Sequence, residues 1–422
     1  MDRMFVTGGA RLSGSVRISG AKNSALKLMA ASLLAPGRSV VRNVPRIRDC
    51  NVMAEMLGHF GVRVTLRDGV AELDATDVHD AEAPHELVRQ MRASIVVLGP
   101  LLARCGRAQV SLPGGDEIGA RPVDLHVRGL ERMGATVRFE HGFLLAEAHE
   151  LRGAHITLDY PSVTATENLL FAAVRAKGVT VLDNAAREPE IADVARCLIA
   201  MGARIDGVGS STIEIEGVDE LQPTDHTAIP DRIEAGTWAA AAVATQGDVT
   251  IENARAEHLE LFLSRIADAG AEVSVSDVGL RIRQVDRALA VDFVTLPYPG
   301  IATDFQPILL AMLATSDGTA IVTENVFESR FLYVGELQRM GADIRTEGHH
   351  AVIRGVSRLS AAPVRALDIR AGAAMVIAAL CADGVTEVAE MQHVDRGYED
   401  FETKLEGLGA EVRRERELVT LP

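Results

Sequence analysis

The chain has 422 residues, of which 47% are apolar and 24% charged, so it is a globular protein too long for one compact core, and we expect two domains. The formal net charge of −16 argues against nucleic acid and anionic membranes as partners, because a field of that sign repels both. A ligand that carries phosphate must therefore be held by a local positive cluster.

The predicted elements recur in the same order six times along the chain. Each copy contains a helix that is rich in small apolar residues and apolar on most faces, which is typical of a buried helix. Examples in chain order are SALKLMAASLLA, ENLLFAAVRA, GTWAAAAVAT, QPILLAMLAT and AAMVIAALCA. A short strand such as VTVLDN, VTIEN or TAIVTEN follows, and then an amphipathic helix such as IADVARCLIAMG or ESRFLYVGELQRMG. A glycine turn and further strands close the copy.

The glycine that ends each amphipathic helix marks the repeat. It stands in FGVRV, MGATV, MGARI, AGAEV, MGADI and LGAEV, and the six copies of this glycine lie 68 to 73 residues apart. Glycine at this place is typical of a left-handed helix C-cap, after which a strand begins. The six marker glycines are Gly61, Gly134, Gly202, Gly270, Gly341 and Gly409.

Buried helices with strands outside them predict layered α/β domains built inside out, with three copies in each domain. The stretch LQPTDHTAIPD, residues 221–231, has two prolines between copies three and four, so we interpret it as the crossing between domains. A cleft between two such domains is a common place for a ligand.

Polar residues stand where the buried helices should begin. Helix N-termini attract anions, and arginine suits bidentate binding of carboxylate and phosphate. These positions therefore predict a cationic cleft for an anionic ligand. For any single arginine, helix capping or a salt bridge between domains remains an alternative. The positions are Lys22, Asn23, Arg92, Ser162, Val163, Asp231, Arg232, Glu234, Asp304 and Arg370, with Arg121, Glu188, Arg330 and Arg396 before the amphipathic helices.

Several classes of protein are not indicated. The four cysteines show no CxxC spacing and lie in or beside apolar segments, so we expect buried thiols rather than disulfides or a zinc site. The twelve histidines show no ligand spacing, and we expect neither a metal nor a cofactor. No signal-peptide pattern is present and no apolar run reaches the ~18 residues of a membrane span. We expect a cytoplasmic protein that does not insert into membranes.

The chain also resembles a known family over essentially its whole length. The motifs SGAKN, MRAS, PGGDEIGARPVDLH, NAAREPEI, PDRIE, TDFQP, ENVFESRF and HVDRGYE stand in this order. They resemble the UDP-N-acetylglucosamine 1-carboxyvinyltransferases, the enolpyruvyl transferases of the first committed step of peptidoglycan synthesis. The resemblance implies a two-domain inside-out α/β barrel, with residues 20–229 in the N-terminal domain and residues 1–19 plus 230–422 in the C-terminal domain. It implies phosphoenolpyruvate and UDP-N-acetylglucosamine as substrates.

The same resemblance assigns roles to individual residues. Lys22 and Asn23 correspond to residues that bind phosphoenolpyruvate and arrange the site, and Arg92 to one that helps to hold the sugar nucleotide. Asp304 corresponds to the carboxylate beside the sugar 3′-hydroxyl, the general base. The other implied substrate-binding residues are Arg121, Pro122, Val123, Asp124 and Leu125 in RPVDL, the turn of Ser162 and Val163, the sugar contact Val326, and Arg330, Arg370 and Arg396 around phosphoenolpyruvate.

The chain departs from the family at a loop expected to be mobile, residues 111–122. Many relatives have a proton-donating cysteine where this chain has Asp116, so the resemblance places Asp116 as the general acid. Because a carboxylate is a much poorer nucleophile than a thiolate, we expect the epoxide antibiotic fosfomycin to fail. Tyr160 and Thr164 also differ from many relatives, near the expected nucleotide pocket.

Two alternatives to this activity remain at this point. One is an enolpyruvyl transferase with another acceptor, such as shikimate 3-phosphate. The other is a non-catalytic relative that binds the sugar nucleotide and regulates the pathway, which the missing loop cysteine favours. The sequence does not determine the oligomeric state.

Overall fold

The structure, a computed structural model, describes residues 2–111, 119 and 123–416. The chain divides at Ser19–Gly20 and at Ile229–Pro230. We call residues 20–111 and 123–229 the first unit and residues 2–19, 119 and 230–416 the second unit, and we describe each by itself. Both units combine helices and sheets, so the predicted α/β class is confirmed. No helix of the described residues is long and apolar enough to cross a membrane.

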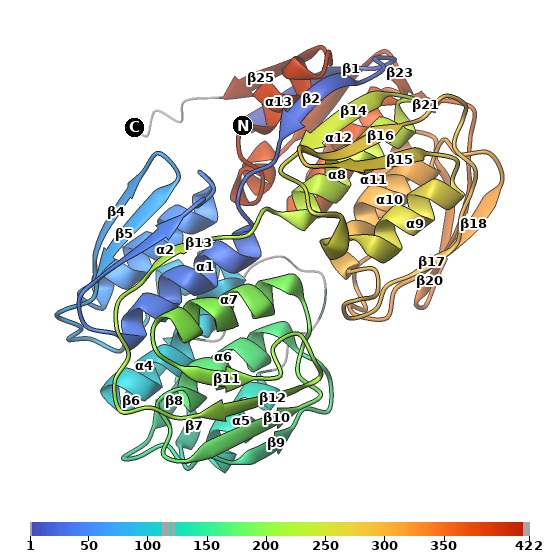
Figure 1. The fold of residues 1–422 in the computed structure, drawn as a ribbon. Helices are drawn as coiled ribbons and strands as arrows, with labels where there is room; N and C mark the ends of the chain where they lie inside the picture. Colours follow the sequence, from blue (N-terminus) through green and yellow to red (C-terminus); the bar gives the residue numbers. More distant parts are fainter. Residues whose placement is uncertain (1, 112–118, 120–122, 417–422) are drawn as a thin grey trace. The chain divides into compact units, whose positions relative to one another are not determined.

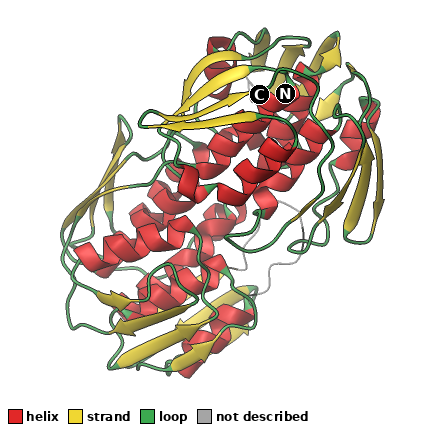
Figure 2. Cartoon of the chain, turned by 45° about the vertical axis from the view of Figure 1, so that its right-hand side comes forward, coloured by secondary structure: helices red, strands yellow, loops and turns green. Residues whose placement is uncertain are grey.

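The first unit has three sheets, which lie outside its buried helices (Figure 2). The order of the first sheet is β13-β3-β5-β4, and β13 is its parallel edge strand. The other two sheets have the orders β6-β8-β7 and β11-β12-β10-β9. The strands are β3 (Arg38–Arg42), β4 (Arg63–Arg67), β5 (Val70–Asp74), β6 (Arg107–Ser111), β7 (Thr136–Glu140), β8 (Phe143–Glu147), β9 (His155–Thr157), β10 (Val179–Asp183), β11 (Arg204–Asp206), β12 (Thr212–Glu216) and β13 (Asp225–Thr227).

The helices of the first unit differ in burial as the sequence predicts. In α1 and α6 nearly every residue is buried, whereas α2, α5 and α7 bury one face and expose the other. The helices are α1 (Lys22–Ala31), η1 (Ser32–Leu34), α2 (Arg48–His59), α3 (His85–Gln90), η2 (Arg92–Val97), α4 (Leu98–Cys105), α5 (Asp124–Arg132), α6 (Val163–Ala173) and α7 (Pro189–Ala200). The buried helices contribute most of their side chains to one cluster of apolar residues, which forms the core of the unit.

The second unit has three four-stranded sheets and uses the start of the chain to build two of them. Strand β1 pairs antiparallel with β24 and β25, and β2 pairs parallel with β14 (Figure 1). The sheet orders are β22-β24-β1-β25, β15-β16-β14-β2 and β17-β18-β20-β19, with a further pair β21-β23. The strands are β1 (Asp2–Thr7), β2 (Ser13–Arg17), β14 (Asp248–Glu252), β15 (Glu272–Ser276), β16 (Gly279–Arg283), β17 (Phe293–Val294), β18 (Thr319–Thr323), β19 (Asp343–Glu347), β20 (His350–Arg354), β21 (Leu359–Ser360), β22 (Val364–Arg365), β23 (Ala382–Asp383), β24 (Val385–Ala389) and β25 (Val412–Arg416).

Three helices of the second unit, α8, α10 and α12, are buried along almost their whole length and form its core. Trp238 on α8 is 1% exposed and packs against Phe401 in this core. The helices are α8 (Arg232–Ala244), η3 (Ala256–His258), α9 (Glu260–Asp268), η4 (Thr303–Phe305), α10 (Gln306–Leu313), α11 (Val334–Arg339), α12 (Ile369–Leu380), η5 (Met391–Arg396) and α13 (Phe401–Gly407).

The marker glycines have the predicted conformation. All six have φ between 89° and 103°, a region that other residues rarely adopt, and each lies just beyond the end of an outer helix. The turn after each outer helix therefore depends on glycine in both units.

Three local expectations need correction. The helix expected to start at Arg92 opens as a 3₁₀ turn, since Pro100 has no N–H to donate to the carbonyl of residue 96 in an α-helix. The outer helix expected from residue 328 begins only at Val334, after a series of turns. Cys105 and Cys381 are partly exposed, whereas Cys50 and Cys197 are buried as expected.

Candidate functional site

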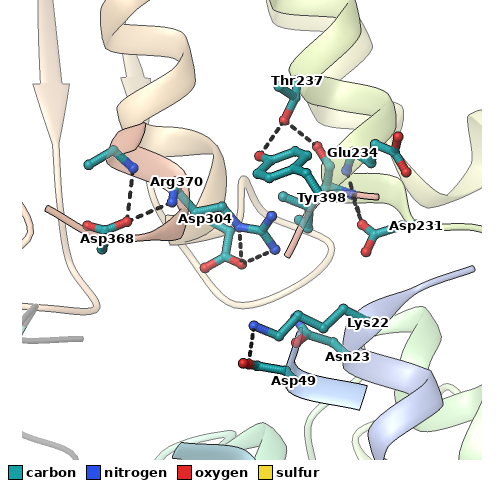
Figure 3. A network of polar contacts seen from close by, with 12 residues as sticks. Lys22, Asn23, Asp49, Asp231, Glu234, Thr237, Asp304, Asp368, Arg370 and Tyr398 are labelled. Atoms are coloured by element: carbon teal, nitrogen blue, oxygen red, sulfur yellow. Dashed lines mark hydrogen bonds and ion pairs between the residues drawn. The ribbon is translucent and has the colours of Figure 1, made fainter. Parts of the chain in front are cut away.

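The candidate site residues of the second unit gather around the start of α12. Asp368 is the N-cap of this helix, and its side chain accepts hydrogen bonds from the N–H groups of Arg370 and Ala371. The cap fixes Arg370 as the second residue of the helix, with its guanidinium beside Asp304 (Figure 3). Nε and Nη2 of Arg370 both lie 3.1 Å from Oδ2 of Asp304.

Arg330 extends this cluster with a second buried guanidinium. Its Nη2 lies 3.9 Å from Oδ1 of Asp304 and its Nη1 lies 3.8 Å from Oδ2 of Asp368. These distances are too long for hydrogen bonds, so the two carboxylates only partly neutralise the arginine. Asp304 and Arg330 of the fifth copy and Arg370 of the sixth copy are therefore brought together.

Arg330 and Arg370 both have buried N–H donors without a hydrogen-bond partner among the described residues. Nε and Nη2 of Arg330 and Nη1 of Arg370 have no hydrogen-bond acceptor among the described residues, although the two side chains are only 2% and 5% exposed. Buried donors are normally satisfied, because an unpaired one costs about 1–3 kcal/mol or more when charged. Unpaired guanidinium donors beside one another indicate a site for an anion with several oxygen atoms.

Tyr398 holds the other face of Arg370. The guanidinium lies 5.2 Å from the centre of the tyrosine ring, and the hydroxyl of Tyr398 is 2.8 Å from Oγ1 of Thr237 on α8 (Figure 3). Burial works against the charge of Arg370, but Tyr398, Asp304 and Asp231 outweigh burial and keep the pKa of Arg370 above its usual value. Burial in turn raises the pKa of Tyr398.

Glu324 holds the backbone of the turn that precedes Arg330. This carboxylate is fully buried, and its Oε1 accepts hydrogen bonds from the N–H groups of Val326 and Phe327 at 2.7 and 3.1 Å. Its Oε2 accepts a hydrogen bond from Thr303, the neighbour of Asp304, at 3.0 Å. One glutamate thus connects the turn with Val326 to the turn with Asp304.

The start of α8 holds the acidic residues Asp231 and Glu234, with the buried Arg232 between them in the chain and its guanidinium 5.5 Å from the centre of the Tyr298 ring. Asp231 is the N-cap and accepts from the N–H groups of Ile233 and Glu234. The carboxylate of Glu234 accepts hydrogen bonds from Ser19, Trp238 and Lys404. These contacts are structural and attach the start of the chain to the second unit. Arg396 ends η5 and is partly exposed.

In the first unit Lys22 is the first residue of α1 and is only 7% exposed. Its Nζ lies 2.8 Å from Oδ2 of Asp49, at the start of α2 (Figure 3). Asn23 follows and is partly exposed. The ion pair holds the ammonium of Lys22 beside the first turn of α1. The free backbone N–H groups of a first turn also favour an anion.

The start of α6 carries Ser162 as its N-cap, with the hydroxyl accepting from the N–H of Ala165, and Val163 as its first residue. Thr164 bonds to Nε2 of the buried His126 on α5 at 3.3 Å, and Asn168 bonds to Nδ1 at 3.0 Å. Burial lowers the pKa of His126 to about 4, so this imidazole is neutral at pH 7. Thr164, one of the departures from the family, thus has an internal partner.

Other sequence predictions lie partly or wholly outside the described residues. Asp116, Arg121 and Pro122 are not described, and nothing is described of the side chain of Arg92, which begins η2. Val123 is the N-cap residue of α5, and Asp124 and Leu125 open this helix.

Sequence reasoning missed several residues that contact the predicted ones. Asp368 had a local signal, because an aspartate two residues before Arg370 at the start of a buried helix is a typical N-cap. Glu324 bonds to the N–H groups of Val326 and Phe327, which are close in the chain, and to the more distant Thr303. Asp49, Thr237 and Tyr398 had no local signal, since the predicted residues that they contact or support lie far away in the chain.

Comparison with known proteins relates this geometry to a family. Residues 6–405 match the family described as EPSP synthase (3-phosphoshikimate 1-carboxyvinyltransferase). A UDP-N-acetylglucosamine 1-carboxyvinyltransferase of Corynebacterium jeikeium is 54% identical over 413 residues, which cover 98% of this chain and 99% of the relative. One of Geobacter metallireducens is 49% identical, with 99% and 100% covered. The chain belongs to the UDP-N-acetylglucosamine 1-carboxyvinyltransferase family.

Solved structures agree with membership of this enolpyruvyl transferase family. The enolpyruvyl transferase NikO from Streptomyces tendae superposes with a TM-score of 0.89 at 27% identity, covering 98% of this chain and 99% of that one. EPSP synthase from Acinetobacter baumannii has a TM-score of 0.78 at 17% identity, with 99% and 100% covered. The second likeness concerns the fold alone.

Proposed function

We propose that this chain transfers the enolpyruvyl group of phosphoenolpyruvate to the 3′-hydroxyl of UDP-N-acetylglucosamine and releases phosphate, as the first committed step of peptidoglycan synthesis. The hydroxyl oxygen adds to C2 of phosphoenolpyruvate while C3 takes up a proton. Loss of a proton from C3 and cleavage of the C2–O bond to phosphate then restore the double bond. The residues must therefore supply an acid, a base and positive charge for a crowded anionic intermediate.

The unpaired donors of Arg330 and Arg370 carry this proposal. Phosphoenolpyruvate brings a carboxylate and a phosphate, and planar guanidinium groups bind such anions through paired hydrogen bonds. Buried donors give such bonds more strength than exposed ones, because water does not compete for them. Arg396 and the pair of Lys22 and Asn23 are proposed to complete the binding of this substrate.

Asp304 is proposed as the general base and Asp116 as the general acid. Asp304 is a carboxylate positioned by two arginines, and it can take the proton of the attacking hydroxyl. When Asp304 becomes neutral, the two guanidinium groups are available to the anionic intermediate. Asp116 can donate a proton to C3 only when it is protonated. A free aspartate titrates near ~3.9, so desolvation beside anionic phosphoenolpyruvate has to raise its pKa, against the effect of nearby arginines.

The sugar nucleotide is proposed to bind at the helix starts of the first unit and at Val326 of the second. Ser162 and Val163 open α6, and residues 123–125 open α5 after Arg121 and Pro122. Helix N-termini suit a diphosphate, and Arg92 adds charge. We further propose that the two units are the two domains of an inside-out α/β barrel with three repeats each, in which buried helices, strands and outer helices recur.

Release of phosphate tests the proposed function. The purified chain is given phosphoenolpyruvate with UDP-N-acetylglucosamine, and in parallel with shikimate 3-phosphate, and phosphate is measured over time. We expect release with the sugar nucleotide alone. Release only with shikimate 3-phosphate would overturn the proposed acceptor. Binding of UDP-N-acetylglucosamine without any turnover would instead support a regulatory relative.

A further inference from the structure

Glu167 is a carboxylate for which the proposed reaction has no use. It lies on α6, is 0% exposed, and neither of its oxygen atoms has a hydrogen-bond partner among the described residues. Its nearest counter-charge is Nζ of Lys27, 3.5 Å from Oε1. The next residue, Asn168, is by contrast fully occupied with Gly99, Ile95 and His126. A buried carboxylate without hydrogen bonds costs stability, so its presence calls for a role.

Lys27 connects this carboxylate to the proposed substrate residues of α1. Its side chain is 4% exposed, and Nζ donates a hydrogen bond of 2.6 Å to the backbone oxygen of Asn23, one turn earlier in the helix. Glu167 itself lies five residues after Ser162, just beyond the first turn of α6. One buried ion pair between the second turns of α1 and α6 thus joins two helices whose starts carry Lys22 and Asn23 on one side and Ser162 and Val163 on the other.

Acidic neighbours make this pair sensitive to pH. Burial raises the pKa of Glu167 to about 7; Lys27 opposes the rise, and Glu190 and Glu188 at the start of α7 add to it. On the other elements packed against α6, His126 of α5 is neutral and bonded to Asn168, and η2 begins with Arg92. Arg104 of α4 is bonded to the backbone oxygens of Leu33 and Ala75, and the acidic residues of β10 and β12 are partly or fully exposed. The pair is therefore fully charged above neutral pH, and protonation of Glu167 removes the counter-charge of Lys27 below it.

We propose that Lys27 and Glu167 are a positioning pair that holds the starts of α1 and α6 in the arrangement that binds the sugar nucleotide, and that protonation of Glu167 loosens this arrangement. The inference rests on the proposed function and adds to it a pair that touches no substrate. When Glu167 is neutral, its attraction for the ammonium of Lys27 is lost and the ammonium is no longer held toward α6. The carbonyl of Asn23 then loses its second donor, and the first turn of α1 loses its tie to α6.

The test compares binding and turnover across pH. We measure the Kd of UDP-N-acetylglucosamine by calorimetry, and kcat and KM for both substrates, from pH 5.5 to 8.5. The variants are Glu167→Gln, which mimics the protonated state at every pH, and the double variant Lys27→Met with Glu167→Gln, which leaves no unpaired buried charge. The matched control is Ser24→Ala, which removes a different buried contact of α1, the bond from Ser24 to Asp193.

In the parent protein we expect affinity for the sugar nucleotide to fall roughly tenfold as pH falls through about 7, since small displacements of positioning groups cost up to about 100-fold. Glu167→Gln should bind weakly at high pH and lose the inflection, and the double variant should lose it too. Ser24→Ala should keep it. An inflection that persists unchanged in Glu167→Gln overturns the positioning role, even if turnover is normal. Failure of the parent protein to bind the sugar nucleotide at all overturns the proposed function first, and this inference with it.

Discussion

Asp304→Asn is the sharpest test of the charged cluster in the second unit. The substitution keeps the shape and an acceptor oxygen but removes the negative charge beside two buried guanidinium groups. Nε and Nη2 of Arg370 lose a charged partner at 3.1 Å, and Arg330 loses one at 3.9 Å. Asp368 is then left close to Arg330 as the remaining carboxylate of the cluster.

The expected loss of stability follows from these contacts. Removal of one partner of a fully buried ion pair costs about 3–5 kcal/mol. Because the side chain of Asp304 is 29% exposed, water screens part of the charge, and we expect a loss of about 2 kcal/mol. For a unit of this size, that corresponds to a Tm lower by roughly 4 to 8 °C. The missing base should also reduce kcat by about 10²–10⁴-fold.

Phosphoenolpyruvate should reverse the loss of stability, since the substrate supplies the missing negative charge. At one hundred times its Kd, a ligand adds about 2.7 kcal/mol to the folded state, enough to offset the loss. Thermal unfolding with and without phosphoenolpyruvate measures this, and phosphate release measures turnover. The matched control is Asp248→Asn, which breaks an exposed pair with Arg281 at 2.7 Å in the same unit and should change Tm by little. Near-normal turnover, or an unfolding curve that phosphoenolpyruvate leaves unchanged, would refute the assigned roles.

Three further predictions test other parts of the site. Tyr398→Phe should keep most activity, because the ring beside the guanidinium of Arg370 remains. Tyr398→Leu should raise the KM for phosphoenolpyruvate about tenfold, since a desolvated cation–π contact contributes roughly 1–2 kcal/mol. Equal effects of the two substitutions in steady-state kinetics would contradict a role for the ring. Burial lowers the pKa of His126 to about 4 from the 6.5 of an unfolded chain, so between these pH values the unfolded state binds a proton that the folded state does not bind. The free energy of unfolding should therefore fall by up to about 3 kcal/mol from pH 6.5 to pH 4. His126→Gln should flatten this fall in urea unfolding, and an unchanged fall would show that other groups cause it. Asp116→Asn should abolish turnover while sugar-nucleotide binding persists, and fosfomycin should inactivate Asp116→Cys but not the parent protein; covalent labelling of the parent loop in mass spectrometry would contradict the second expectation.

The sequence predicted the lysine and arginine residues of the candidate site better than the carboxylates that pair with them. Lys22 and Arg370 stand at one recurring place of the repeat and Arg330 at another, so the sequence alone indicates that they have a common task. Their partners Asp49, Asp304 and Asp368 were either unnoticed or assigned only a catalytic role. A carboxylate that neutralises an arginine looks the same in a sequence as one that faces water.

The sequence by itself determined the elements of this protein. Local patterns predict the buried helices, and glycine alone suits the turn that follows each outer helix, because these properties depend on neighbouring residues. Only the tertiary structure decided which charges meet. Arg370 and Asp304 are 66 residues apart in the chain, and Ser24 and Asp193 are 169 apart. The role proposed for Glu167 likewise appeared only with its burial, because the cost of a charge depends on what packs around it and not on its place in the sequence.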